Sequence, residues 1–199
     1  MNRFGKLFLG LLVLTVIGVS TMVHIGRARE WAERGGIAEP PPPPPATALV
    51  APSGLAVPVA GVAPGQLQDT FDDPRAGGAR GHHALDIPAA TGTPVLAAAG
   101  GIVEKLFESK DGGHTIYQRS PDGRFVYYYA HLDSYRPELR EGALLVRGQP
   151  IAAVGATGDA NPAAPHLHFE IKRMAPGETW YQGEDIDPYP LLAGRAAPR

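Results

Sequence analysis

From about Pro58 onward, short apolar and β-branched runs alternate with polar positions, and Gly, Pro or Asp turns separate them. This alternation places successive side chains on opposite faces of a strand, and no segment sustains the helical period. The pattern predicts an all-β domain, an antiparallel sheet sandwich or open barrel. The expected strands are Leu67–Phe71, Leu85–Ile87, Pro94–Ala99, Gly101–Ser109, His114–Arg119, Phe125–Leu132, Ala143–Val146, Ile151–Val154 and His166–Met174, before a closing segment at Asp187–Leu192.

The N-terminus has a different pattern. Leu7–Gly26 is uncharged, and at about 1.5 Å per residue a helix of this length would cross a hydrocarbon core of about 30 Å. We expect residues 1–26 to form a cytoplasmic stub and an uncleaved transmembrane signal anchor. Arg3 and Lys6 would stay inside, which leaves the rest on the extracytoplasmic (periplasmic) side of the inner membrane. A cleaved signal peptide is the alternative, but Ser20–Ile25 lacks a small-x-small cleavage site.

A proline-rich segment follows the predicted anchor. Pro40–Pro45 is a run of consecutive prolines, which adopts the stiff polyproline II conformation. We interpret residues 27–57 as an extracytoplasmic tether; a ligand for a proline-binding domain is the alternative, but flanking specificity residues are missing. The folded domain is then expected at 58–192, with a tail at 193–199.

Composition narrows the possible functions. The net charge of −2 and the lack of a basic stripe give no indication of a nucleic-acid partner. Gly and Pro, 25 and 21 in number, disfavour a helical bundle. The chain has no cysteine, which excludes disulfides and thiolate ligands, so any metal must be held by nitrogen and oxygen atoms.

Most of the 7 histidines gather in three segments that also carry an acidic residue or a strand end. His82 and Asp86 lie four apart, and His131 ends a strand-like run. His166 and His168 lie two apart on a strand, so both project from the same face. Taken alone, each has a simpler interpretation, such as a loop histidine, a turn cap or a packed strand-end ring. One shared site explains all five at once.

Their chemistry suits metal-assisted hydrolysis. A catalytic zinc takes three protein ligands and keeps a position for water, whose pKa it lowers to about 7. His82, Asp86 and one histidine of the His166/His168 pair supply the ligands. The remaining histidine of that pair and His131 would orient or deprotonate the water and donate to the transition state. The spacing leaves open which member of the pair is the ligand.

The same segments resemble the lysostaphin-type (LytM-type) zinc endopeptidases over about Leu67–Leu192. The resemblance implies the duplicated hybrid motif fold, with His82, Asp86 and His168 as Zn²⁺ ligands and His131 and His166 as catalytic residues. The segments that carry it are Arg80-Gly81-His82-His83-Ala84-Leu85-Asp86-Ile87, Gly92-Thr93-Pro94-Val95, Tyr129-Ala130-His131-Leu132, Gly148-Gln149, Gly155-Ala156-Thr157-Gly158 and Pro165-His166-Leu167-His168-Phe169-Glu170.

The resemblance implies a zinc metalloendopeptidase that hydrolyses peptide (crosslink) bonds in the peptide stems of peptidoglycan, and the predicted anchor places it at the membrane. A regulatory protein is a further expected partner. The bond could be a D-alanyl–diaminopimelate crosslink or a glycine bridge. A catalytically inactive module that activates an amidase is the main alternative, although family members of that kind typically lose zinc ligands and all five positions are intact here. A zinc peptidase acting on protein is another.

This chain departs from the family pattern in two places. Ala84 stands where the family usually has glycine, so the loop backbone is expected to differ, and Asp159–Ala164 is longer than the common link and is expected to reshape one groove wall. His83 and His114 match no family role and are expected to be ordinary, partly exposed side chains. Glu170 is either a partner of a ligand histidine or a packing residue.

Overall fold

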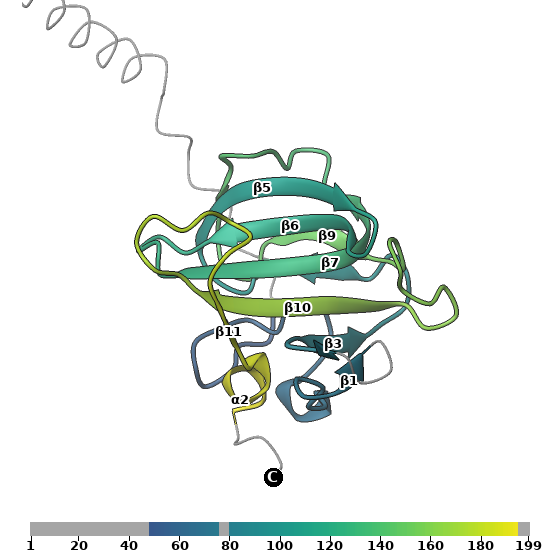
Figure 1. The fold of residues 1–199 in the computed structure, drawn as a ribbon. Helices are drawn as coiled ribbons and strands as arrows, with labels where there is room; N and C mark the ends of the chain where they lie inside the picture. The colour runs from purple at the N-terminus through teal and green to yellow at the C-terminus, as the bar shows by residue number, and fades with distance from the viewer. Residues whose placement is uncertain (1–47, 76–79, 195–199) are drawn as a thin grey trace, which may run out of the picture. The chain divides into compact units, whose positions relative to one another are not determined.

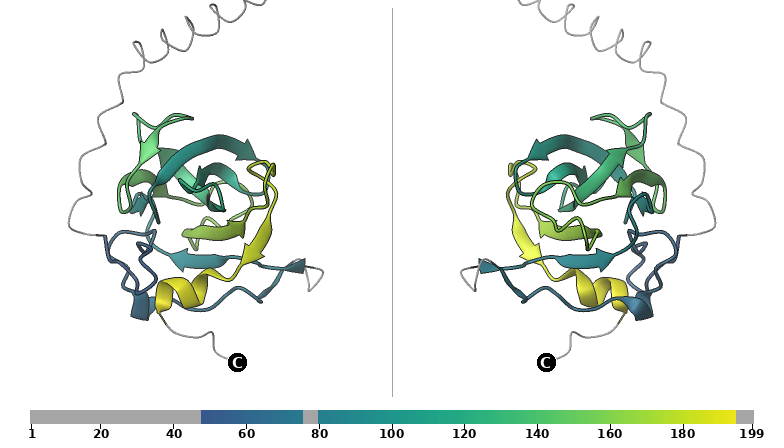
Figure 2. Two further views of the ribbon diagram at one scale, coloured as in Figure 1. Left: turned by 90° about the vertical axis from the view of Figure 1, so that its left-hand side faces the viewer. Right: turned by 90° about the vertical axis from the view of Figure 1, so that its right-hand side faces the viewer.

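The computed structural model describes residues 48–75 and 80–194, in which nearly all regular structure is β. Figure 1 shows β5, β6, β7 and β10 side by side, and Figure 2 shows the sheet curling round its core. The prediction of a mainly antiparallel β fold is confirmed. The strands are β1 (Pro74–Arg75), β2 (Arg80–Gly81), β3 (Leu85–Pro88), β4 (Pro94–Leu96), β5 (Gly101–Ser109), β6 (Gly113–Arg119), β7 (Phe125–Tyr135), β8 (Leu144–Leu145), β9 (Pro150–Val154), β10 (His166–Arg173) and β11 (Glu184–Ile186).

One nine-stranded sheet dominates the fold. Its main path is β11-β10-β7-β6-β5-β8, while β3 pairs with β10, and β9 pairs with both β4 and β7. All of these pairs are antiparallel. Strand β10 pairs with β3 along His166–Phe169 and with β7 along His168–Arg173, so both strands flank His168. The pairing with β3 brings segments about 80 residues apart in sequence into register.

The core lies inside the curled sheet and follows the predicted alternation. On β10, Leu167, Phe169 and Ile171 are buried, and the residues between them are less so. Tyr129 on β7 packs against Phe169 with ring centroids 5.2 Å apart. Its hydroxyl donates to Gln118 Oε1 at 2.6 Å and accepts from the Ala98 backbone N–H at 2.9 Å, so this buried polar group is satisfied.

The N-terminal segment of the described chain belongs to this fold. Ala56 and Val57 are completely buried, and Val50 bridges to Ala56. The packed region thus begins before Pro58, where the peptidase domain was expected to start. The tether and tail boundaries stay predictions, because residues 27–47 and 195–199 lie outside the described residues.

The segment expected to form the first strand is irregular. No strand forms at Leu67–Phe71. There, the Asp69 side chain accepts from the Phe71 backbone N–H at 3.1 Å, a local bond that competes with a strand ladder. A short 3₁₀ helix, η1 (Pro64–Gln66), precedes this segment.

The closing segment forms helix α2 (Pro188–Ala193). Asp187 caps the helix by accepting from the Tyr189 N–H. Over the described ranges, 48–75 and 80–194, no helix is both long and apolar enough to cross a membrane, and the predicted anchor at 1–26 lies outside them.

Candidate metal centre

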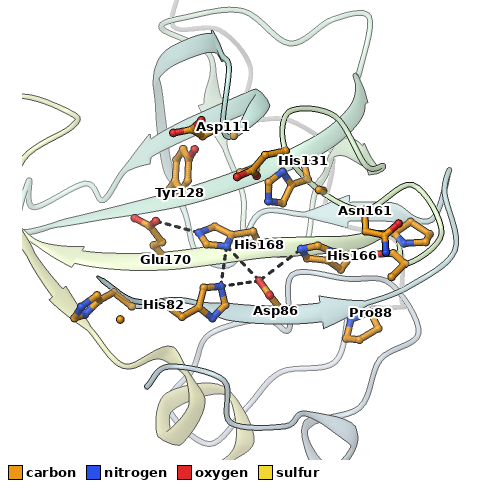
Figure 3. A pocket seen from close by; sticks show the side chains of 18 of the residues that line it. His82, Asp86, Pro88, Asp111, Tyr128, His131, Asn161, His166, His168 and Glu170 are labelled. Atoms are coloured by element: carbon orange, nitrogen blue, oxygen red, sulfur yellow. Dashed lines mark hydrogen bonds and ion pairs between the residues drawn. The ribbon is translucent and has the colours of Figure 1, made fainter. Parts of the chain in front are cut away.

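The site is organised by the polar face of β10. His166, His168 and Glu170 alternate with the buried residues of this strand and project from the same face (Figure 3). Asp86 on β3 is the direct cross-strand partner of His168, and Ala130 on β7 is its partner on the other side. The antiparallel register therefore places the Asp86 carboxylate beside the His168 ring.

Three candidate ligand atoms converge. The His82 Nε2, Asp86 Oδ1 and His168 Nδ1 atoms all lie within 4.8 Å of one another. The pairwise distances are 3.0 Å from His82 Nε2 to His168 Nδ1, 3.0 Å from His82 Nε2 to Asp86 Oδ1, and 3.2 Å from His168 Nδ1 to Asp86 Oδ1. Ligands about 2.1 Å from a tetrahedral zinc would be about 3.4 Å apart. These residues fit a zinc ion.

In His82 and His168, the ring nitrogen that points away from the candidate metal position, here called the outer nitrogen, lies near an oxygen acceptor. His82 Nδ1 lies 2.8 Å from the Thr70 carbonyl oxygen, and His168 Nε2 lies 3.1 Å from Glu170 Oε1. An acceptor at the outer nitrogen holds the hydrogen there and leaves a lone pair on the inner nitrogen. The irregular segment that replaces the expected first strand thus supplies the carbonyl that orients His82.

His131 reaches the site because β7 contains a bulge. Ala130 already faces the site, so strict alternation would turn His131 to the opposite face. Between the pairs Ile116↔Tyr129 and His114↔Leu132, β7 carries one more residue than β6. His131 lies in this bulge with a φ of 59°, in the left-handed region, and a bulge re-aims a side chain in this way.

His131 and His166 flank the three candidate ligands. Their ring centroids are 5.0 Å apart, and the His131 ring is 5.6 Å from that of His168. His131 Nδ1 lies 2.9 Å from the Thr157 carbonyl oxygen, and His166 Nδ1 lies 2.9 Å from that of Ala164. With the hydrogen held on Nδ1, the Nε2 atom of each ring is left to accept a proton. His166 Nε2 lies 3.7 Å from Asp86 Oδ1.

The loop that anchors His131 needs glycine at 158. Gly158 has a φ of +76°, and a Cβ there would lie 2.1 Å from the Asp111 carbonyl oxygen. The Asp159 N–H donates to that same oxygen at 2.9 Å. The backbone at Gly158 packs closely against the backbone at Asp111, and this keeps the neighbouring Thr157 carbonyl next to His131.

The electrostatics of the cluster follow from its histidines and carboxylates. Burial opposes ionisation of Asp86, but hydrogen bonds from His168 and His82 hold the pKa of its carboxyl far below the usual range. Burial would lower the pKa of His168, yet Asp86 and Glu170 raise it to about 9. For His131, burial lowers the pKa, and nearby His168 and His166 add to this effect against the opposing Thr157 carbonyl. His131 is therefore neutral at pH 7 and able to accept a proton.

These residues line a groove of about 1080 Å³ (Figure 3). All five sequence-predicted site residues face it, and the long Asp159–Ala164 segment contributes to its wall. Burial and the neighbouring Tyr117 and Glu170 raise the pKa of the Tyr128 hydroxyl, so Tyr128 presents a neutral phenol. The lining residues are Gly81, His82, His83, Asp86, Pro88, Asp111, Gly112, Tyr128, Ala130, His131, Asp159, Ala160, Asn161, Ala164, Pro165, His166, His168, Glu170 and Asp185.

The two remaining described histidines lie apart from the candidate ligands. His83 is exposed, and its ring packs edge-on against Phe71 with centroids 5.4 Å apart. His114 packs against Tyr135 at 5.7 Å, and its Nε2 lies 3.8 Å from Glu108. His83 also takes the left-handed backbone conformation, with a φ of 57°, whereas Ala84 does not. Alanine at 84 is accommodated because the left-handed residue is its neighbour.

Sequence reasoning missed the groups that orient these rings. Three of them are backbone carbonyls, of Thr70, Thr157 and Ala164, for which residue type gives no signal. The side chains of Lys172 and Asp185, which lie behind Glu170, were also missed. The alternation of β10 could have placed Lys172 on the site face, two residues beyond Glu170.

Comparison with known proteins agrees with this geometry. The family model described as peptidase family M23 matches residues 80–188, which include all five candidate site residues and more than half of the chain. The chain belongs to peptidase family M23. The resemblance to lysostaphin-type peptidases is thereby confirmed, since solved structures of that type are among its structural neighbours.

Relatives of this chain are named as endopeptidases. An L-Ala–D-Glu endopeptidase of Bacillus subtilis is 32% identical over 131 residues, which cover 63% of this chain and 39% of that protein. A peptidoglycan DD-endopeptidase of Vibrio cholerae is 34% identical over 98 residues, 49% of this chain and 22% of that protein. This M23 chain thus matches well under half the length of either relative.

The M23 fold also matches at the level of structure. The catalytic domain of lysostaphin, an antimicrobial peptidase from Staphylococcus simulans, superposes with a TM-score of 0.50 at 29% sequence identity. The match covers 63% of this chain and 87% of that domain. The curled antiparallel sheet is therefore the peptidase fold of this family.

Proposed function

We propose that this chain is a zinc-dependent endopeptidase that hydrolyses peptide bonds in the stems or crosslinks of cell-wall peptidoglycan. The observation that carries the proposal is the convergence of His82 Nε2, Asp86 Oδ1 and His168 Nδ1 beside two further histidines, in one groove. The M23 family match and the names of the relatives from Bacillus subtilis and Vibrio cholerae support the substrate class.

In this proposal His82, Asp86 and His168 hold the metal. A zinc ion bound there supplies Lewis acidity and a water whose pKa lies near 7. The outer ring nitrogen of each histidine is anchored on an oxygen acceptor, and Asp86 is ionised across the physiological range because its pKa is far below normal. The chain therefore presents two neutral nitrogen donors and one anionic oxygen once the proton on His168 is displaced.

His131 and His166 are the proposed catalytic residues. Each has its Nδ1 anchored on a backbone carbonyl, so its Nε2 is the nitrogen available for proton transfer. His131 is neutral at pH 7 because burial lowers its pKa, and it suits the role of general base. His166 lies beside Asp86 and across from His131, and it would donate a hydrogen bond to the developing oxyanion once its Nε2 carries a proton.

The cellular location is part of the same proposal. Peptidoglycan lies outside the inner membrane, so the substrate requires an extracytoplasmic domain. The uncharged Leu7–Gly26 stretch would serve as a single-pass anchor, and the proline-rich part of the predicted tether that precedes the packed region, residues 27–47, as the spacer. About 20 residues of spacer would reach about 70 Å when fully extended, which lets the domain search the wall from the membrane.

The test uses the full-length chain loaded with zinc and incubated with purified sacculi. Released fragments are identified by mass, beside a chelator-treated sample and a His82→Ala variant. Zinc-dependent release is expected, and the fragment masses distinguish a D-alanyl–diaminopimelate crosslink, a glycine bridge and a bond within the stem. A folded, zinc-loaded protein that releases no fragment, but binds sacculi and activates an amidase, would overturn the proposal in favour of a regulatory module.

A further inference from the structure

The candidate ligand His168 is oriented by a different kind of group from the other site histidines. His82, His131 and His166 each place one ring nitrogen on a backbone carbonyl. His168 instead places its Nε2 3.1 Å from a side-chain carboxylate oxygen, Oε1 of Glu170. Glu170 lies two residues further along β10, on the same face, and Figure 3 shows the two side chains pointing toward each other.

Glu170 is itself held in place from behind. Its second oxygen, Oε2, lies 2.8 Å from Lys172 Nζ, and that ammonium also contacts Asp185 Oδ1 at 2.5 Å. Asp185 is the cross-strand partner of Lys172, on β11. The side chains of Glu170 and Lys172 are only 17% and 15% exposed, so this row of contacts is shielded from solvent.

The ionised carboxylate determines where the His168 hydrogen sits. A carboxylate can only accept hydrogen bonds, whereas a neutral imidazole carries its hydrogen on one nitrogen and a lone pair on the other. Oε1 of Glu170 therefore holds the hydrogen on Nε2. In the neutral ring, the form that binds zinc, Nδ1 then has its lone pair directed at the point where Asp86 and His82 converge.

We propose that Glu170, supported by Lys172 and Asp185, is a positioning residue that sets the tautomer and orientation of His168 for zinc. The inference rests on the proposed function, in which His82, Asp86 and His168 hold the metal. A charged acceptor also raises the basicity of the ligand ring more than a neutral carbonyl does.

Lys172 has a separate part in this arrangement. Glu170 and Asp86 are two carboxylates on either side of the His168 ring. Repulsion between their negative charges would weaken the contact that each makes with this ring. The Lys172 ammonium offsets the charge of Glu170 and fixes its rotamer, while Asp185 fixes Lys172. Strand β11 thus contributes to the metal centre although it carries none of the proposed ligands.

The test compares zinc affinities of full-length variants by competition with a chromophoric chelator. Glu170→Gln keeps the size of the side chain but presents an amide N–H₂ to either His168 or Lys172. Outer partners of ligand histidines are typically worth about 10–100-fold in metal affinity, and a loss of this size is expected. Lys172→Met should give a smaller loss, and Lys172→Arg should restore most of it.

Glu184→Gln is the matched control. Glu184 lies next to Asp185 on β11 and pairs with Arg173, but both side chains are exposed, at 72% and 61%. This variant should bind zinc as tightly as the unaltered protein. In ¹⁵N NMR of the zinc-free protein, at a pH where the His168 ring is neutral, the hydrogen should be found on Nε2. Glu170→Gln should shift it toward Nδ1, a change that a purely structural role for Glu170 would not predict.

The outcomes separate this inference from the proposed function. An unaltered protein that binds no zinc would overturn the proposed function. Zinc binding by the unaltered protein, with the same affinity in Glu170→Gln, would overturn only the positioning role. A changed KM with unchanged zinc affinity would instead make Glu170 a substrate contact, which also contradicts the inference. If Glu170→Gln does not fold, unchanged zinc affinity in Lys172→Met contradicts the support that Lys172 is proposed to give.

Discussion

Zinc affinity of this chain should increase with pH, because a proton occupies the candidate site when the metal is absent. Asp86 and Glu170 raise the pKa of His168 to about 9. At pH 7 the ring therefore carries two hydrogens, one on Nε2 toward Glu170 and one on Nδ1 toward Asp86. Zinc can bind His168 Nδ1 only after the second hydrogen leaves.

The size of the effect follows from the distance between pH 7 and that pKa. About two pH units separate them, so displacing the proton costs about 2.7 kcal/mol, and the apparent zinc affinity is about 100-fold weaker than in the deprotonated protein. Below pH 9 the affinity should rise about tenfold per pH unit. Above pH 9 this contribution levels off. Asp86 adds no slope in this range because its pKa is far below normal.

The assay is chelator competition on the full-length chain between pH 6.5 and 10, corrected for titration of the chelator and for zinc hydrolysis. His131→Ala is the control, because His131 is not a proposed ligand and should leave the slope unchanged. An affinity that is flat from pH 7 to pH 9 would refute the reasoning. It would mean that His168 is already neutral at pH 7, and that Asp86 and Glu170 do not stabilise its charge.

Three other substitutions have definite expected outcomes. His131→Ala should keep zinc binding and lose about 10²–10⁴-fold in turnover on sacculi, as expected for removal of a general base, and unaltered rates would contradict that role. His168→Ala should lose both zinc, measured by metal analysis of the purified protein, and hydrolysis; full zinc occupancy would remove it from the ligand set. Gly158→Ala should lower the free energy of unfolding by about 1–3 kcal/mol or more, because a Cβ at this positive φ would meet the Asp111 carbonyl. In thermal unfolding, Gly123→Ala is its control, with a φ of +73° but no atom within 4 Å of the added Cβ, and an equal effect would exclude the clash as the cause.

The strands were predictable because their burial follows a local rule. The β10 sequence alternates strictly, and its buried and less buried residues fall where the period of two places them. The predicted strands from Leu85 to Met174 all have counterparts in the sheet. Helix α2 was only described as a closing segment, although Asp187 followed by Pro188 is a helix-start signal that could have identified it.

The residue types of the candidate site were predictable from the sequence. The strand register and the backbone carbonyls that position these residues were not. Imidazole and carboxylate groups at short spacings indicate metal chemistry wherever the fold brings them together. What brings them together here is long-range register, such as the pairing of His168 with Asp86 and Ala130, and register depends on partners far away in sequence. The carbonyl that orients His82 comes from Thr70, in a segment whose apolar residues predicted a strand that does not form.

His131 shows most clearly why a pattern alone is insufficient. Alternation along β7 would direct His131 away from the site, since Ala130 is the residue opposite His168. The bulge that corrects this uses a left-handed backbone at a residue with a Cβ, which costs about 1 kcal/mol or more. Among the described residues, only His83 and His131 are non-glycine residues with positive φ, and both line the groove.

Backbone strain of this kind persists only where surrounding contacts determine it. The His131 N–H donates to the Gly112 carbonyl at 2.8 Å and its ring is anchored on the Thr157 carbonyl, while the His83 N–H donates to the Phe71 carbonyl at 2.8 Å. Each left-handed residue therefore makes a backbone bond to a different segment lining or bordering the groove. The strain at His83 occurs inside the His82–Asp86 spacing, whose two side chains face the same point. The two strained positions are thus part of how a β fold, whose side chains otherwise alternate between faces, gathers histidines from three segments on one face.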